Sequence, residues 1–138
     1  MKGIEKFIVI GAIALGFIAG VNGTLMITAP ETWYWLVPGV PDRGPFNQHF
    51  IRDIGIIYLL SGAAYIYGAL HASSRVLLWV VPTAWFVAHG IFHIWEVLVG
   101  ICGPASLLED FGGVYLTAMI GVLLIFLERR QRSKAENV

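Results

Sequence analysis

Residues 76–101 read VLLWVVPTAWFVAHGIFHIWEVLVGI, an apolar run in which Glu96 is the only formally charged member. A helix needs about 20 mostly apolar residues to cross the roughly 30 Å hydrocarbon core of a bilayer. Three further runs of suitable length lie at about 7–27, 48–70 and 110–128. Since these runs are continuously apolar rather than alternating, they predict helices and not the strands of a barrel. The sequence therefore predicts an all-α fold: an integral membrane four-helix bundle formed by a single domain, 1–138, whose tail is frayed over residues 129–138.

The composition of the chain supports this fold class. The 138 residues are 57% hydrophobic and only 13% charged, whereas a soluble domain usually carries about 25% charged residues. The net charge of zero gives no basic field for nucleic acid. The single cysteine, Cys102, excludes an internal disulfide. These features exclude a soluble globular fold, a nucleic-acid partner and an intrachain dithiol.

Basic residues predict the orientation of the helices. Four helices place both termini and the short connection at 71–75 on one side of the bilayer. Seven basic residues fall on that side and two on the other, so both termini are expected to be cytoplasmic in a bacterial inner membrane. The first set comprises Lys2, Lys6, Arg75, Arg129, Arg130, Arg132 and Lys134, and the second Arg43 and Arg52. The run at 7–27 is longer than the apolar core of a signal peptide, about 7–15 residues, so we expect it to be retained; cleavage is the alternative.

The connection between the first two helices is long and unusual in composition. Residues 28–47 read TAPETWYWLVPGVPDRGPFN, with four prolines and a Trp33-Tyr34-Trp35 cluster typical of a membrane interface. The density of proline and glycine predicts an ordered, non-helical lid on the outer surface.

Small residues recur at intervals of four on two of the predicted helices. Gly16 and Gly20 form one such pair, and Ala64 and Gly68 form another. Pairs of this kind let helix backbones approach closely in lipid. They predict close packing within the chain, with a dimer face as the alternative.

Five ionisable residues occur where such residues are costly, inside the predicted helices. His89, His93 and Glu96 have the spacing i, i+4, i+7, and His49 and Asp53 have the spacing i, i+4. Each set therefore shares one face of its helix. Because the two helices are consecutive and antiparallel, both sets are expected near the outer surface at the same depth. Ionisable residues within a membrane are functional candidates by default.

Three interpretations of these five residues stay open. Imidazoles and carboxylates on facing helices suit a transition metal ion such as zinc, copper or iron. A proton- or substrate-coupled polar network is the second interpretation. In the third the residues are structural, and Arg52 pairs with Asp53 or Glu96. Haem is disfavoured, because two histidines on one helix cannot supply opposite axial ligands.

Other polar residues are weaker candidates for the same site. Glu109 and Asp110 precede the fourth helix, where acidic residues complement the helix dipole. Either could add a ligand if that helix abuts the site. Asn22, in the outer half of the first helix, could hydrogen-bond into the same network.

The second helix carries a family resemblance. The segment NQHFIRDIG at 47–55, followed by YL at 58–59 and SG at 61–62, resembles small bacterial membrane proteins of the DoxX-like group. The resemblance implies a four-helix inner-membrane protein. Proteins of that group are associated with quinone-linked sulfur oxidation and with thiol or oxidative-stress systems. A single cysteine departs from thiol chemistry, and no catalytic residue carries over.

These observations together predict a small inner-membrane protein with a polar, metal-binding pocket near the outer surface. Its expected metal ligands are His49, Asp53, His89, His93 and Glu96. If the protein is an enzyme, the bound metal would activate water or a small redox substrate. The alternatives are a non-enzymatic accessory or assembly subunit of a larger membrane complex, and a small-solute or proton-coupled transporter acting as a homo-oligomer.

Overall fold

The computed structural model of the protein describes residues 3–136, and this part of the chain contains helices and no strands. Four long helices dominate it, namely α1 (Gly3–Thr28), α3 (Gln48–Leu70), α4 (Arg75–Leu98) and α6 (Leu116–Glu136). Together with their flanking turns, all four are long and apolar enough to cross a membrane. The prediction of an all-helical protein with four membrane-length helices is confirmed. The surface agrees with it, because large apolar side chains such as Phe17, Leu77 and Val81 are exposed on these helices, where lipid would cover them.

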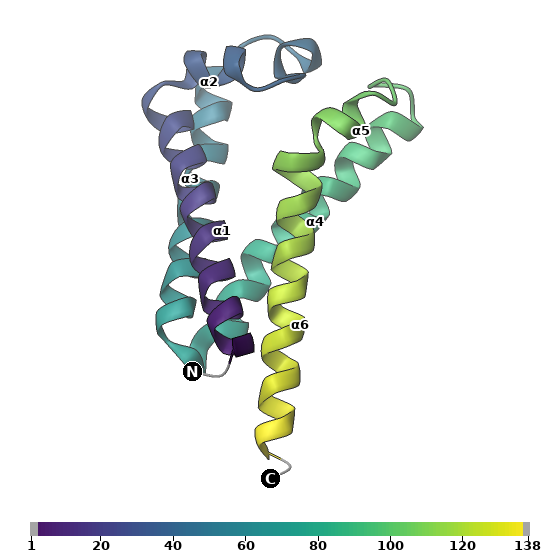
Figure 1. The fold of residues 1–138 in the computed structure, drawn as a ribbon. Coiled ribbons are helices and arrows are strands. Elements are labelled where there is room, and N and C mark those ends of the chain that lie inside the picture. The colour runs from purple at the N-terminus through teal and green to yellow at the C-terminus, as the bar shows by residue number, and fades with distance from the viewer. Residues whose placement is uncertain (1–2, 137–138) are drawn as a thin grey trace.

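Shorter elements connect the long helices. The first connection contains α2 (Pro30–Leu36) and the 3₁₀ turn η1 (Val40–Arg43). The second is the 3₁₀ turn η2 (Ala72–Ser74), and the third contains α5 (Ser106–Glu109) and the π-helical turn η3 (Phe111–Tyr115). Both ends of the described chain lie at the same end of the bundle (Figure 1). We call this end, with η2, the base, and the opposite end, with α2, η1 and α5, the lid end.

Two boundaries differ from the sequence prediction. The expectation of a non-helical lid is wrong for residues 30–36, because Pro30 occupies the first turn of α2, where its missing N–H and fixed φ favour a helix start. The frayed tail over residues 129–138 stays a prediction, and in the structure α6 continues to Glu136. Residues 137–138 of that tail, and Lys2, lie outside the described part of the chain.

Glycines bring α1 and α3 into backbone contact. A Cβ atom on Gly23 would lie 2.6 Å from the carbonyl oxygen of Gly55, and one on Gly16 would lie 2.8 Å from that of Gly62. Neither distance is tolerable, so only glycine allows this approach. Gly16 thus serves packing within the chain, as predicted for the small residues. The rest of the core includes Tyr65, whose hydroxyl and that of Thr83 on α4 hydrogen-bond at 2.7 Å.

The two helix pairs diverge from the base toward the lid end. The ribbon shows α1 and α3 side by side, while α4 and α6 lean away from them at the lid end (Figure 1). At the base the pairs are joined by the buried Arg75. Its guanidinium lies 3.3 Å from Glu128 of α6 and 3.8 Å from Glu5 of α1, and it donates to the Ala69 carbonyl of α3. We call this group the base cluster; Arg132, which bonds to Glu128 and to the Ala72 carbonyl, completes it.

The glycine contact gives a test of the α1–α3 packing. We expect Gly23→Ala to lower the free energy of unfolding by about 1–3 kcal/mol, the usual cost of overpacking. Gly20→Ala is the matched control, because a Cβ atom there meets nothing within 4 Å. Alanine has a higher helix propensity than glycine by about 1 kcal/mol. This gain is the same in both variants, so it cancels when their stabilities are compared. Denaturation by SDS in mixed micelles measures the difference, and equal stabilities would contradict the contact.

The base cluster gives a second test. Arg75→Met leaves the buried Glu128 with Arg132 alone, and breaking a buried ion pair in this way typically costs about 3–5 kcal/mol. The same denaturation assay measures the loss. Arg130→Met is the control, since Arg130 is exposed on the same turn of α6. A similar small effect of both changes would show that the cluster does not hold the base together.

Candidate functional site

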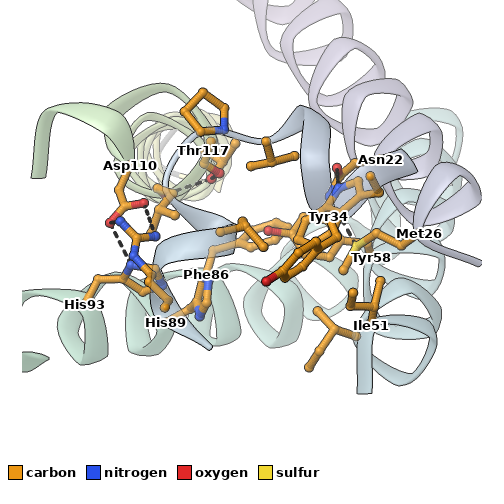
Figure 2. Close-up of a pocket in the computed structure, with 18 of the residues that line it drawn as sticks. Asn22, Met26, Tyr34, Ile51, Tyr58, Phe86, His89, His93, Asp110 and Thr117 are labelled. Atoms are coloured by element: carbon orange, nitrogen blue, oxygen red, sulfur yellow. Dashed lines mark hydrogen bonds and ion pairs between the residues drawn. The ribbon is translucent and has the colours of Figure 1, made fainter. Parts of the chain in front are cut away.

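A cavity of about 620 Å³ lies between the two helix pairs at the lid end. Its walls come from α1, α3, α4, η3 and α6, and the lid segments α2 and η1 cover it. The close-up shows polar side chains at two opposite ends, with Phe86 and Tyr58 between them (Figure 2). The walls are mostly apolar, and they include Leu15, Ala19 and Ile54. A largely apolar cavity with a few convergent polar groups is the usual form of a small-molecule site.

Asp110 is the centre of the first polar end. Both of its oxygens accept hydrogen bonds from Arg43, at 2.7 Å and 3.0 Å, and Oδ2 also lies 2.7 Å from Nδ1 of His93 (Figure 2). The Asp110 side chain is 6% exposed, that of His93 11% and that of Arg43 18%. Glu109 adds a longer contact to Arg43, at 3.6 Å. We call Arg43, His93, Glu109 and Asp110 the lid cluster.

Local backbone geometry brings Arg43 and Asp110 together. Gly39, which directly precedes η1, has a φ of 77° and lies so close to Glu109 that a Cβ atom would meet its Oε2 at 2.5 Å. Tyr34 of α2 anchors the same turn by donating a hydrogen bond to the Gly44 carbonyl at 2.8 Å. On the other side, Asp110 directly precedes the π-helical turn η3. Such turns are rare, and they occur often at functional sites.

The neighbouring Asp110 keeps Arg43 ionised. Burial by itself lowers the pKa of Arg43, but the hydrogen bonds and the negative charge of Asp110 outweigh burial, and the pKa is raised above its ordinary value. Arg43 therefore stays positive, and it makes a two-point contact with both oxygens of Asp110. The cluster is a fixed ion pair to which a histidine is attached.

His89 lies beside His93 and also lines the cavity. Its ring stacks on Trp85 with centroids 5.0 Å apart, and it meets the ring of His93 edge-on at 4.5 Å. Within residues 3–136, neither ring nitrogen of His89 has a hydrogen-bond partner.

The second polar end of the cavity is formed by Asn22 of α1 and Trp33 of α2. The indole N–H of Trp33 donates to the side-chain oxygen of Asn22 at 2.8 Å. Among the described residues, the amide nitrogen of Asn22 has only the sulfur of Met26 as a partner, at 3.6 Å. Asn22 thus lines the predicted site, but it bonds to the lid and not to the histidines.

The five predicted ligands do not lie together in the structure. His89 and His93 line the cavity, whereas His49, Asp53 and Glu96 do not. His49 pairs with Asp53 at 3.3 Å, with 89% and 57% of the two side chains exposed. In the described part of the chain, no group of three or more His, Cys, Asp or Glu side chains is placed to hold a metal ion. Metal binding stays a prediction, and these five residues do not form one group.

The rotation of α3 about its axis explains why His49 and Asp53 do not line the cavity. On α3, Phe50, Ile51 and Ile54 line the cavity, so the neighbouring positions 49 and 53 lie on another face. The structural interpretation paired Arg52 with Asp53 or Glu96, but the structure gives Arg52 other partners. Arg52 instead donates to the Ile27 carbonyl and to Gln48.

Arg43 was missed as a site residue, whereas Asp110 was expected only as an additional ligand. The sequence did hold a signal for their pairing. The long first connection carries Arg43, and the third carries Glu109 and Asp110. Opposite charges on two outer connections over an apolar bundle favour such a contact.

No family model, curated protein or solved structure matches the chain. The resemblance to the DoxX-like group therefore stays a prediction.

The ion pair between Arg43 and Asp110 is expected to hold the lid in place. We expect Arg43→Met to raise the hydrogen-exchange rate of the lid amides by roughly tenfold or more, because the lid loses its buried ion pair to Asp110. The amides of Val40 and Asp42, which donate within the turn, report the change. Asp53→Asn removes only an exposed pair and is the control, since such pairs contribute little. An unchanged lid in the Arg43 variant would contradict this role.

Proposed function

We propose that this protein binds an elongated, mostly apolar small molecule in the cavity between its two helix pairs. The observation that carries the proposal is the cavity itself, which combines apolar walls with a buried lid cluster at one end. Its volume of about 620 Å³ falls within the roughly 300–1,000 Å³ of typical small-molecule sites. A cavity that served packing alone would be costly, since each lost contact lowers stability.

Exposed wall residues support entry of the ligand from the bilayer. Ile18 of α1, Phe50 of α3 and Phe92 of α4 line the cavity, yet each is at least half exposed. The cavity therefore reaches the apolar outer surface of the bundle, where lipid would lie. A molecule dissolved in the hydrocarbon core could enter without crossing water.

We place the lid end of the bundle at the outer face of a bacterial inner membrane. The support is the distribution of basic residues, which gather at the base. The ligand would then enter from the outer leaflet, beneath a lid rich in aromatic residues.

Quenching of tryptophan fluorescence by bromododecane tests the proposal. Trp33 and Trp85 line the cavity, Trp79 is fully buried, and Trp35 and Trp95 are exposed. In a Trp35→Phe, Trp95→Phe background in lipid nanodiscs, bromine quenches the two cavity indoles when the probe enters. We expect saturable quenching, whereas collisions from lipid alone would rise without saturation.

A filled cavity supplies the matched comparison. Gly113 lines the cavity, and a Cβ atom there meets nothing within 4 Å. We expect Gly113→Leu to weaken the apparent affinity by roughly tenfold, because the added side chain occupies apolar space worth about 1–2 kcal/mol to a ligand. Gly103→Leu is the control, since Gly103 is equally open but lies outside the cavity. Quenching that never saturates, or that both changes affect equally, would overturn the proposal.

A further inference from the structure

We infer that the ligand carries an uncharged hydroxyl group and that His93 accepts the hydrogen bond from this group. The inference rests on the proposed function and specifies the ligand class. It is drawn from the hydrogen-bonding capacity of the lid cluster, atom by atom.

The first step concerns the proton on His93. Asp110 is held as a carboxylate by two bonds from Arg43, and a carboxylate can only accept hydrogen bonds. The 2.7 Å contact between Asp110 Oδ2 and His93 Nδ1 therefore requires a hydrogen on Nδ1. In the neutral ring, the other nitrogen, Nε2, is then an acceptor.

The second step concerns the partner of Nε2. In the part of the chain that the structure describes, no side chain or backbone group donates to this atom. The neighbouring ring of His89 meets His93 edge-on, as a packing contact. His93 lines the cavity and its side chain is only 11% exposed. A ligand in the cavity is thus the available source of a donor.

The third step concerns charge. Arg43 has one positive charge, and the carboxylates of Asp110 and Glu109 lie 2.7 Å and 3.6 Å from it. Its charge is fully compensated, so the cluster offers no free cation to a carboxylate or phosphate. The buried carboxylate beside His93 gives a cationic ligand no free oxygen either, because both Asp110 oxygens already accept hydrogen bonds. The other carboxylate, Glu109, is 42% exposed, so solvent screens its attraction for a cation. A neutral donor fits this cluster, and in a mostly apolar molecule that donor is a hydroxyl group.

Four probes with the same chain test the inference, namely bromododecane, ω-bromododecanol, ω-bromododecanoic acid and ω-bromododecylamine. Affinities from the nanodisc quenching assay are expressed as mole fractions in the lipid, so that partitioning does not enter the comparison. We expect the alcohol to bind roughly five- to tenfold more tightly than the alkane, the effect of one net hydrogen bond. The acid and the amine are expected to bind more weakly than the alcohol.

His93→Asn identifies the atom responsible. The asparagine amide can still donate to Asp110 from a position close to that of Nδ1, but it has no counterpart of Nε2. We expect the ratio of the affinities for the alcohol and for bromododecane to fall to about one, whatever the absolute affinity of the variant. His49→Asn is the matched control, because His49 is exposed outside the cavity, and it should leave the preference unchanged.

The outcomes separate the two proposals. Saturable binding of the alkane with no preference for the alcohol, or tightest binding of the acid or the amine, would overturn the hydroxyl inference and leave the cavity proposal standing. A preference for alcohol that survives His93→Asn would also overturn it. If no probe binds saturably, the cavity proposal fails, and the inference fails with it.

Discussion

Arg75 holds the four long helices together at the base, and the helices extend from there toward the lid end. It is buried, yet it carries a charge, and its partners come from the three other long helices: Glu5 on α1, the Ala69 carbonyl on α3 and Glu128 on α6. A buried arginine without such partners would be very costly, so the four helix ends must stay together at the base. At the lid end no comparable contact joins α1 and α3 directly to α4 and α6 in the described residues. The pairs can therefore diverge, and the cavity lies where they do.

The lid cluster is the counterpart of the base cluster at the opposite end. There the ion pair joins two connections, since Arg43 lies in η1 and Asp110 lies between α5 and η3. The lid is thereby held to the α4–α6 side, while Asn22 and Trp33 hold it to α1. Between the two clusters the contacts are mostly apolar, and the polar ones include the paired hydroxyls of Tyr65 and Thr83 and the Trp79 indole on the Tyr65 carbonyl. This distribution follows from the bilayer, in which charges are tolerated at the ends of helices far more readily than at the centre.

The constraints of the bilayer made much of the fold predictable from the sequence. Helix number and approximate bounds followed from the thickness of the bilayer, which sets the length of each apolar run. The proximity of His89 and His93 followed from the helical repeat. The sequence did not predict which face of α3 is turned toward α4. Equal depth on two antiparallel helices does not determine how each helix is rotated about its axis, and in the structure His49 and Asp53 face outward. Arg43 was missed because its contact with Asp110 spans 67 positions of the chain, and the opposite charges of the two outer connections point to this contact only indirectly.

The chain as a whole has no net charge, and at the lid cluster the charges of Arg43 and Asp110 lie in direct contact. Arg43 and Asp110 satisfy each other, so under the proposed function a ligand there would not be selected by attraction to this ion pair. Its selection would depend instead on which lone pairs and hydrogens the ion pair leaves unused. Asp110 occupies Nδ1 of His93 and thereby fixes Nε2 as an acceptor, much as a carboxylate orients the histidine of many catalytic and metal sites. The role of the ion pair is therefore to set the hydrogen-bonding character of its neighbour, and an apolar cavity gains one directional polar contact without a free charge.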